Sequence, residues 1–171
     1  MKSLDAKVLS IITIIFALAA FRLVQFIPNV TPIAAMALFA GAHFSDKKLA
    51  FVIPFAALLI SDLILGLHST MLFVYAAFAL TLWIGMALQN KSALFITLSA
   101  IGSSLLFFLI TNTGVWLMYN TYSAGLTGLI ESYVAGIPFY KNTLAGDLVF
   151  SAVLFGGYAL LTQSKSQKQA V

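Results

Sequence analysis

Apolar residues along the chain fall into six long runs separated by short polar breaks. The runs cover approximately residues 8–27, 32–45, 49–66, 70–89, 93–111 and 143–163. Most of them approach the ~20 residues that a helix needs to cross a bilayer core of about 30 Å. The pattern therefore predicts an all-α integral membrane protein with six transmembrane helices, of which the second is short, in a single membrane domain spanning residues 1–171.

The composition strengthens this prediction and excludes several other classes. Hydrophobic residues make up 61% of the chain and charged residues only 8%, whereas about a quarter of a typical soluble domain is charged. The chain has no cysteine, which excludes disulfides and thiolate chemistry. Its basic residues lie at the ends of apolar runs and not along one face, so we expect a lipid bilayer and no nucleic acid as its surroundings.

The distribution of lysines predicts the orientation in the membrane. A first helix that starts in the cytoplasm places seven lysines inside, namely Lys2, Lys7, Lys47, Lys48, Lys91, Lys165 and Lys168. Only Arg22 and Lys141 then face the outside. This bias predicts a multi-pass protein of the bacterial inner membrane with both termini in the cytoplasm. The first run resembles a signal peptide, but it continues to Ile27, so we expect an intact helix.

The break at residues 28–31 separates the first apolar run from the short second one. From Pro32 to Ser45 a helix would measure about 21 Å, less than the ~30 Å bilayer core. We expect Thr31 to cap this helix and the break to lie below the outer surface. Irregular backbone at such depth must be buried in protein or line a wet cavity. We therefore expect Asn29 and Thr31 to form the floor of an outward-facing pocket, where the helix N-terminus offers free N–H groups.

The segment between the fifth and sixth runs, residues 112–142, is too polar to span a membrane. Within it, apolar residues recur at helical spacing from Leu126 to Ile137 and polar residues occupy the other side. This spacing predicts an amphipathic outer helix over about residues 124–137, flanked by Trp116 and several tyrosines. Such a helix is either a lid over the pocket or an anchor in the membrane interface.

Three charged residues fall inside the predicted helices, at similar depth. Arg22, Asp62 and Asp147 each lie roughly 6–8 Å below the outer boundary, counted at a rise of 1.5 Å per residue. Charges at this depth are costly unless they pair or face water, so we expect them to converge. They form either an ion pair that only holds helices together or a binding site. One arginine against two aspartates would leave that site net negative.

The predicted substrate-binding set joins these charges to the polar residues around the same level. It comprises Arg22, Asn29, Thr31, Asp62, His68, Asn112, Trp116, Asn142 and Asp147. The histidine lies in a short outer turn, where it is either simply solvated or a ligand. The aspartates favour an amine-bearing solute, whereas the arginine and the helix N-terminus favour an acidic group. A zwitterion or a heterocycle would satisfy both, and the tryptophan could stack on its ring.

No catalytic pattern accompanies these residues. The chain lacks the nucleophile elbow G-x-S-x-G, the zinc motif H-E-x-x-H and a Walker A lysine. Its two histidines are distant from each other and do not form a zinc pattern. The residues around Asp62 and Asp147 do not resemble those of an intramembrane aspartyl protease. We therefore predict that the protein is not an enzyme and uses no cofactor or metal.

Several stretches resemble known transport proteins. The strings IPNVTPIAAMALFAGAHF, ISDLILG and IPFYKNTLAGDLVFSAVLFGGYALL are similar to an uncharacterised family of bacterial transport proteins. The length, the six helices and the outer polar site also resemble the S-components, the substrate-binding subunits of energy-coupling-factor vitamin transporters. This resemblance implies capture of a vitamin or related micronutrient, and a transmembrane coupling subunit with two ATPases as partner. Small residues dock that subunit in S-components, and here Ala34, Ala37 and Gly41 offer the best such face.

Two other functions remain compatible with the same residues. In the first, the protein is a scaffold or assembly factor of the inner membrane, and its buried charges are purely structural. In the second, it is a small proton-coupled carrier that works without a coupling subunit, and an aspartate titrates during turnover. Binding of a small molecule by the purified protein would distinguish the transport functions from the scaffold.

Overall fold

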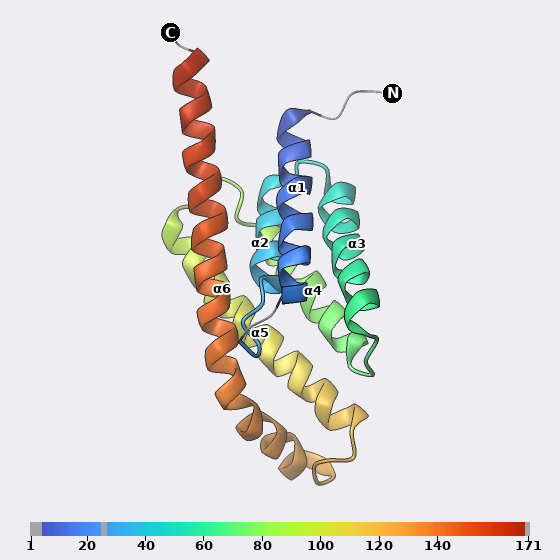
Figure 1. The fold of residues 1–171 in the computed structure, drawn as a ribbon. Helices are drawn as coiled ribbons and strands as arrows, with labels where there is room; N and C mark the ends of the chain where they lie inside the picture. Colours follow the sequence, from blue (N-terminus) through green and yellow to red (C-terminus); the bar gives the residue numbers. More distant parts are fainter. Residues whose placement is uncertain (1–4, 25–26, 170–171) are drawn as a thin grey trace.

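The computed structural model describes residues 5–24 and 27–169, whose regular structure is helical. In chain order the elements are α1 (Ala6–Phe21), the short 3₁₀ helix η1 (Arg22–Val24), α2 (Ile33–His43), α3 (Lys47–Leu65), α4 (Met71–Met86), α5 (Ala93–Met118) and α6 (Gly125–Gln169). Successive α-helices alternate in direction, so the two ends of the chain lie at the same end of the molecule (Figure 1). We call this the terminal end. The α3–α4 and α5–α6 connections lie toward the opposite, or turn, end.

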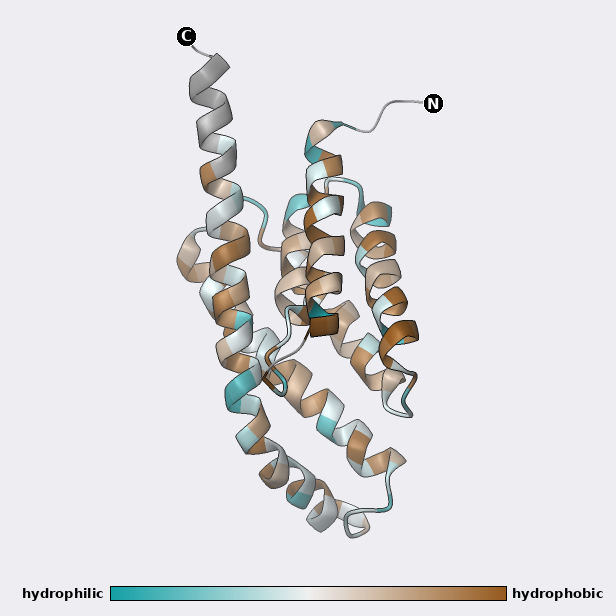
Figure 2. Ribbon diagram, viewed as in Figure 1, coloured by the Kyte–Doolittle hydropathy of each residue, from teal (hydrophilic) through white to brown (hydrophobic). Residues whose placement is uncertain are grey.

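Within the part of the chain that the structure describes, four helical segments are long and apolar enough to cross a membrane. They are Ala6–Val24, Lys47–Leu65, Ala93–Met118 and Gly125–Leu160, while α2 and α4 are apolar but shorter. Large apolar side chains point outward along these helices, with Trp83, Val153 and Leu160 each more than 60% exposed. Hydrophobic residues follow the helices over most of their length (Figure 2). A surface this apolar is stable against lipid, which confirms the predicted helical membrane protein.

Side chains cap the starts of two helices, whereas the N-cap residues of α2, α4 and α5 make no side-chain capping bond. Asp5 and Asp46 are the N-caps of α1 and α3, and each carboxylate accepts a bond from a backbone N–H two residues later. The expectation that Thr31 caps α2 is wrong, because Pro32 occupies the N-cap and makes no side-chain capping bond. The α2 helix therefore begins at Ile33 with no side chain capping its first N–H groups.

The α2 helix is the centre of the bundle. Every residue from Ile33 to Gly41 is buried, and α2 contacts all five other α-helices. A Cβ added at Gly41 would lie 2.3 Å from the Leu82 carbonyl oxygen, and one at Gly85 would lie 2.5 Å from that of Leu38. The α2 and α4 backbones therefore touch directly, which only glycine permits.

This packing corrects one prediction about the small residues of α2. Ala34, Ala37 and Gly41 were expected to form a docking face for a coupling subunit. All three are buried inside the bundle, and Gly41 lies against α4. The small side chains allow close packing within the chain, and they leave no surface there for another protein.

The last two helices are longer than their apolar runs indicate. The α5 helix continues to Met118, well past residue 111, and α6 extends without interruption from Gly125 to Gln169. The predicted outer helix at 124–137 and the sixth helix at 143–163 are therefore one element, which curves in its first part near Pro138 (Figure 1). Proline bends a helix without ending it where neighbouring groups satisfy the freed carbonyl.

Candidate functional site

Arg22 is held at the end of α1 by residues of α3. Its Nη1 donates to the Ser61 hydroxyl over 2.7 Å and forms an ion pair with Asp62 Oδ1. The second oxygen of Asp62 accepts a bond from the Tyr75 hydroxyl over 2.9 Å. Because Asp62 is only 1% exposed, both of its oxygens need such partners. The carboxylate therefore fixes the position of the guanidinium and links α1, α3 and α4.

The break before α2 forms a tight turn against α6. The Val30 N–H donates to the Ile27 carbonyl over 3.2 Å, and Asn29 adopts a positive φ of 62°, which asparagine tolerates better than most residues. The Asn142 side chain donates to the Pro28 carbonyl over 3.1 Å. One turn further along α6, a Cβ at Gly146 would lie 3.2 Å from Val30. The turn is therefore held against the part of α6 that is long and apolar enough to cross a membrane.

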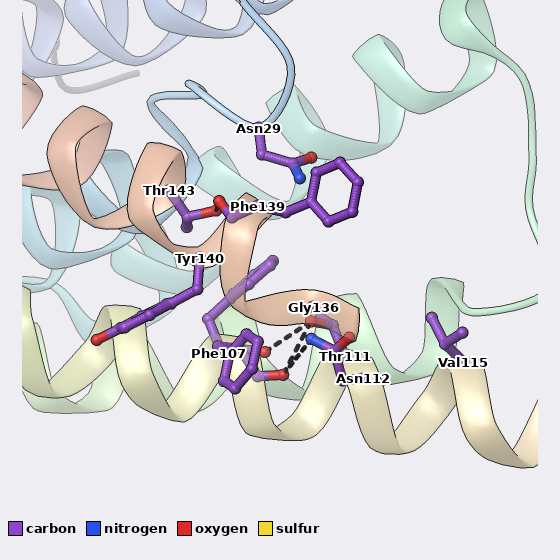
Figure 3. A pocket seen from close by; sticks show the side chains of 10 residues that line it. Asn29, Phe107, Thr111, Asn112, Val115, Gly136, Phe139, Tyr140 and Thr143 are labelled. Carbon is purple, nitrogen blue, oxygen red and sulfur yellow. Dashed lines mark hydrogen bonds between the residues drawn. The ribbon is translucent and has the colours of Figure 1, made fainter. Parts of the chain in front are cut away.

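Two adjoining cavities lie between this turn, α5 and α6. The first has a volume of about 200 Å³ and is lined by Arg22, Asn29, Thr31, Ile33, Leu65, Val74, Phe107 and Thr143. The second, of about 230 Å³, is lined by Asn29, Phe107, Phe108, Thr111, Asn112, Val115, Gly136, Phe139, Tyr140 and Thr143. Because they share Asn29, Phe107 and Thr143, we treat them as one space and call it the Asn29 cleft. The second part is drawn in Figure 3, where Asn29 lies across from the α5 side chains.

The far wall of the Asn29 cleft combines rings with hydrogen-bonding groups. The ring centroids of Phe108 and Tyr140 are 4.9 Å apart, so α5 and α6 together present an aromatic surface. Asn112 donates to the Phe108 carbonyl over 2.9 Å. A Cβ at Gly136 would lie 2.5 Å from Asn112 Oδ1, so this glycine makes room for the amide. Such a wall can stack on a flat solute and also bond to its polar edge.

The structure brings together only part of the predicted set. Arg22, Asn29, Thr31 and Asn112 line the Asn29 cleft, Asn142 holds its turn, and Asp62 acts through Arg22. His68 instead contacts the Thr70 hydroxyl within the α3–α4 connection. Trp116 donates to the Ser123 carbonyl and so holds the α5–α6 connection. Asp147 is buried in α6 and lines neither cavity.

The predicted convergence of three charges is therefore wrong in one member. Arg22 and Asp62 pair with each other, and no ion pair or hydrogen bond joins Asp147 to either of these described residues. Among the residues that the structure describes, none that lines the Asn29 cleft carries a carboxylate. This removes the excess negative charge that favoured an amine, and it leaves the arginine as the one charged side chain of the lining.

Sequence reasoning missed several residues of the site. Tyr75 belongs to an apolar run that looks lipid-facing, yet its hydroxyl reaches Asp62. The polar hydroxyl of this tyrosine is the only feature of the sequence that could have indicated a buried partner. Thr143 follows Asn142 and was hidden at the start of the sixth run. The aromatic lining residues of α5 are indistinguishable in sequence from those that face lipid, because both sets are apolar.

Three other cavities are less suited to bind a polar solute that enters at the turn end, because of their position or their apolar lining. One of about 340 Å³ lies at the terminal end, where Lys7, His43 and Lys91 contribute to its lining. Two others are lined mainly by apolar side chains, one by α4 and α5 and one by α6. The Asn29 cleft combines a broken helix, a fixed guanidinium and two amides, so we take it as the candidate site.

Comparison with known proteins identifies the family but no activity. The chain belongs to a family of unknown function (DUF6580), whose profile matches residues 2–170. No curated protein and no solved structure matches the chain significantly.

Proposed function

We propose that this chain captures a small polar micronutrient in the Asn29 cleft, as a substrate-binding subunit that resembles the S-components. The observation that carries this proposal is the arrangement around the broken helix. Arg22, fixed by Asp62, faces the same cleft as Asn29, so a cationic donor and an amide converge beside irregular backbone. Discontinuous helices in transporters use such a junction to hold polar solutes.

The lining favours a flat solute with an acidic group. The guanidinium of Arg22 offers charge-assisted donors for a carboxylate or phosphate. The amides of Asn29 and Asn112 can pair with a polar ring edge, and Phe108 can stack on its face. A vitamin-like acid or zwitterion meets these requirements better than an amine.

Membrane placement follows from the same proposal. Six helices cross the bacterial inner membrane, the terminal end faces the cytoplasm and the Asn29 cleft opens toward the outside. The lysine distribution supports this orientation, as does the common end of the two termini (Figure 1). A coupling subunit with two ATPases would contact an outer helix surface, because the small-residue face of α2 is buried.

The test begins with the solute that the protein carries. Native mass spectrometry of purified protein should reveal a co-purifying small molecule, and its identification allows binding to be measured. Asn29→Gly should weaken that binding at least tenfold, since glycine keeps the positive φ and removes the amide from both cavities. Asn90→Gly is the matched control, because Asn90 also has a positive φ and lines only the cavity at the terminal end.

A scaffold function is the second candidate, and one observation favours it. Asp62 has a partner for each oxygen, as a purely structural ion pair would. In that case purified protein is consistently empty, and Asn29→Gly has no effect on uptake of any solute.

A further inference from the structure

The cavity at the terminal end of the bundle is separate from the Asn29 cleft. Its volume is about 340 Å³, and α1, α2, the α4–α5 connection, α5 and α6 all contribute to its lining. It shares no lining residue with the Asn29 cleft. Lys7 and Lys91 give its lining two positive charges, and none of the described residues that line it carries a carboxylate. The cavity is therefore suited to an anion.

The two lysines of this cavity have no anionic partner in the part of the chain that the structure describes. Neither the Lys7 nor the Lys91 ammonium forms an ion pair or a hydrogen bond there. Asp5, the acidic residue nearest to Lys7 in sequence, is the N-cap of α1 and accepts the backbone N–H of that lysine. The Lys91 ammonium lies 5.9 Å from the centroid of the Phe95 ring. Two like charges beside one cavity repel each other, and a bound anion would relieve this repulsion.

The connection that carries Lys91 is held in a defined position. The Gln89 side chain donates to the Phe44 carbonyl over 3.4 Å, which joins the α4–α5 connection to the end of α2. Asn90 adopts a positive φ of 59°, and the Lys91 N–H donates to the Leu88 carbonyl over 3.0 Å. The turn therefore places the lysine beside the cavity before any ligand binds, which lowers the entropy cost of binding.

His43 adds a hydrogen-bonding group among aromatic rings. Its Nδ1 lies 2.9 Å from the Phe39 carbonyl and must donate to it, because a carbonyl only accepts. Neutral His43 then has Nε2 as an acceptor, and none of the described residues bonds to this atom. The His43 ring centroid is 4.4 Å from that of Tyr158 and 5.3 Å from that of Phe155, and both rings line the cavity. The lining thus combines two cations with an acceptor and an apolar wall.

The position of the cavity along the helices matches that of lipid headgroups. Lys7 lies in the first turn of α1, and Lys91 lies two residues before the start of α5. Both helices belong to segments that are long and apolar enough to cross a membrane. Lysines at the ends of such helices lie in the interface, where the lipid phosphates also lie. Basic pockets between membrane helices bind the headgroups of anionic lipids.

We propose that the terminal-end cavity binds a phosphate group between Lys7 and Lys91, with a hydroxyl-bearing part of the same ligand against His43. An anionic phospholipid supplies this chemistry from the bilayer, and a soluble phosphate ester supplies it from water. The site does not depend on the function of the Asn29 cleft. Because the lining comes from five parts of the chain, the bound phosphate should stabilise the folded bundle.

Thermal unfolding and native mass spectrometry of purified, delipidated protein in a neutral detergent test this site. Phosphatidylglycerol should raise the unfolding midpoint progressively, whereas phosphatidylcholine with the same acyl chains should not. Lys7→Gln/Lys91→Gln should weaken phosphatidylglycerol binding by about tenfold or more, since it removes both charges. Both lysines are exposed, so this variant should fold as the wild type does.

Lys47→Gln/Lys48→Gln is the charge-matched control. It removes two charges from exposed residues at the same end of the molecule, and neither residue lines the cavity. Its affinity for phosphatidylglycerol should stay within about twofold of the wild type, because the local charges of the cavity are retained. An equal loss of affinity in the two double variants would overturn the proposal, since net charge alone would then explain the binding.

Glycerol 3-phosphate distinguishes the two sources of the phosphate. A rise in midpoint that depends on Lys7 and Lys91, without any difference between the two lipids, would support the site and identify a soluble ester as its ligand. The proposal is overturned if neither phosphatidylglycerol nor glycerol 3-phosphate raises the midpoint above that in phosphatidylcholine. Full affinity for either probe in Lys7→Gln/Lys91→Gln would also overturn it.

Discussion

Asp62 illustrates how one buried carboxylate can serve a site that it does not touch. It has no place in the lining of the Asn29 cleft, yet it fixes the arginine that does. A guanidinium in an apolar bundle needs a counter-charge, and the bond from Tyr75 satisfies the remaining carboxylate oxygen. The pair therefore links the helices and, under the proposed function, also positions the guanidinium that binds the solute.

Tyr75→Phe should separate these two roles. The change leaves Asp62 Oδ2 without its donor, so we expect the free energy of unfolding to fall by about 1–3 kcal/mol. Solute affinity should stay within twofold, because Arg22 keeps both of its bonds. Thermal unfolding and solute binding on the same preparation measure the two effects. Tyr119→Phe, at an exposed position, should change neither quantity. A large loss of affinity in Tyr75→Phe would show that Tyr75 itself contacts the solute.

Asp62→Asn should lower both the stability and the solute affinity. It removes the counter-charge of Arg22, and breaking a buried ion pair in this way typically costs about 3–5 kcal/mol. The guanidinium then loses its fixed position, so solute affinity should fall by tenfold or more. Binding isotherms and unfolding curves should change together in this variant. Unchanged affinity would exclude Arg22 from solute recognition.

At the scale of the element, α2 shows why small residues matter in this fold. The helix is surrounded on all sides, and its contact with α4 is a contact between backbones. Alanine and glycine lose little side-chain entropy on burial and allow the closest approach of two helices. From sequence alone, the same stripe is indistinguishable from a docking face, because both uses require small side chains.

Gly41→Ala should test this contact. The new Cβ would lie 2.3 Å from the Leu82 carbonyl and 2.7 Å from the Met86 nitrogen. Both are backbone atoms of α4, so the two helices must move apart. We therefore expect the free energy of unfolding to fall by about 1–3 kcal/mol. Gly156→Ala in α6 is the matched control, since nothing lies within 4 Å of its Cβ position. That variant should be neutral or slightly more stable, by about 0.5–1 kcal/mol, through helix propensity. Equal midpoints for the two variants would contradict the backbone contact.

The α6 helix marks the limit of sequence reasoning about elements. The amphipathic pattern predicts a helix over about residues 124–137, and the stretch is helical from Gly125, but it is continuous with the predicted sixth helix and is not a separate element. Leu126, Ile130 and Val134 are exposed, while Ser132 is buried and donates to the Asn112 carbonyl of α5. The small residues Gly128, Ser132 and Gly136 are therefore buried on the side of the neighbouring helix, and the large apolar residues point outward. This stretch is packed on α5, and α6 continues across Pro138 without a loop.

At the scale of the whole molecule, the hydropathy pattern predicts most of the helices but few of the residues that line the Asn29 cleft. Four long apolar helices and two shorter ones follow directly from composition, because lipid imposes the same requirement on every turn. The cleft depends on which residues of facing helices meet. The sequence predicts the same depth for Arg22, Asp62 and Asp147 and so allows the arginine to pair with either aspartate, whereas in the structure it pairs with Asp62. The depth of a residue along its helix therefore does not predict which neighbouring helix its side chain contacts, and a binding site depends on both.

The orientation of the molecule gives a final prediction. The chain has no cysteine, so a single introduced cysteine can report which side of the membrane a loop occupies. Ser69, in the α3–α4 connection, and Ser45, between α2 and α3, are both exposed. In intact cells, a membrane-impermeant maleimide should label Ser69→Cys if the turn end faces outside, as we propose. Ser45→Cys should react only after the membrane is permeabilised, since Lys47 and Lys48 beside it hold that connection in the cytoplasm. The reverse labelling pattern would show that the orientation is opposite to the proposed one. The Asn29 cleft would then lie on the cytoplasmic side, where it could not capture an external solute.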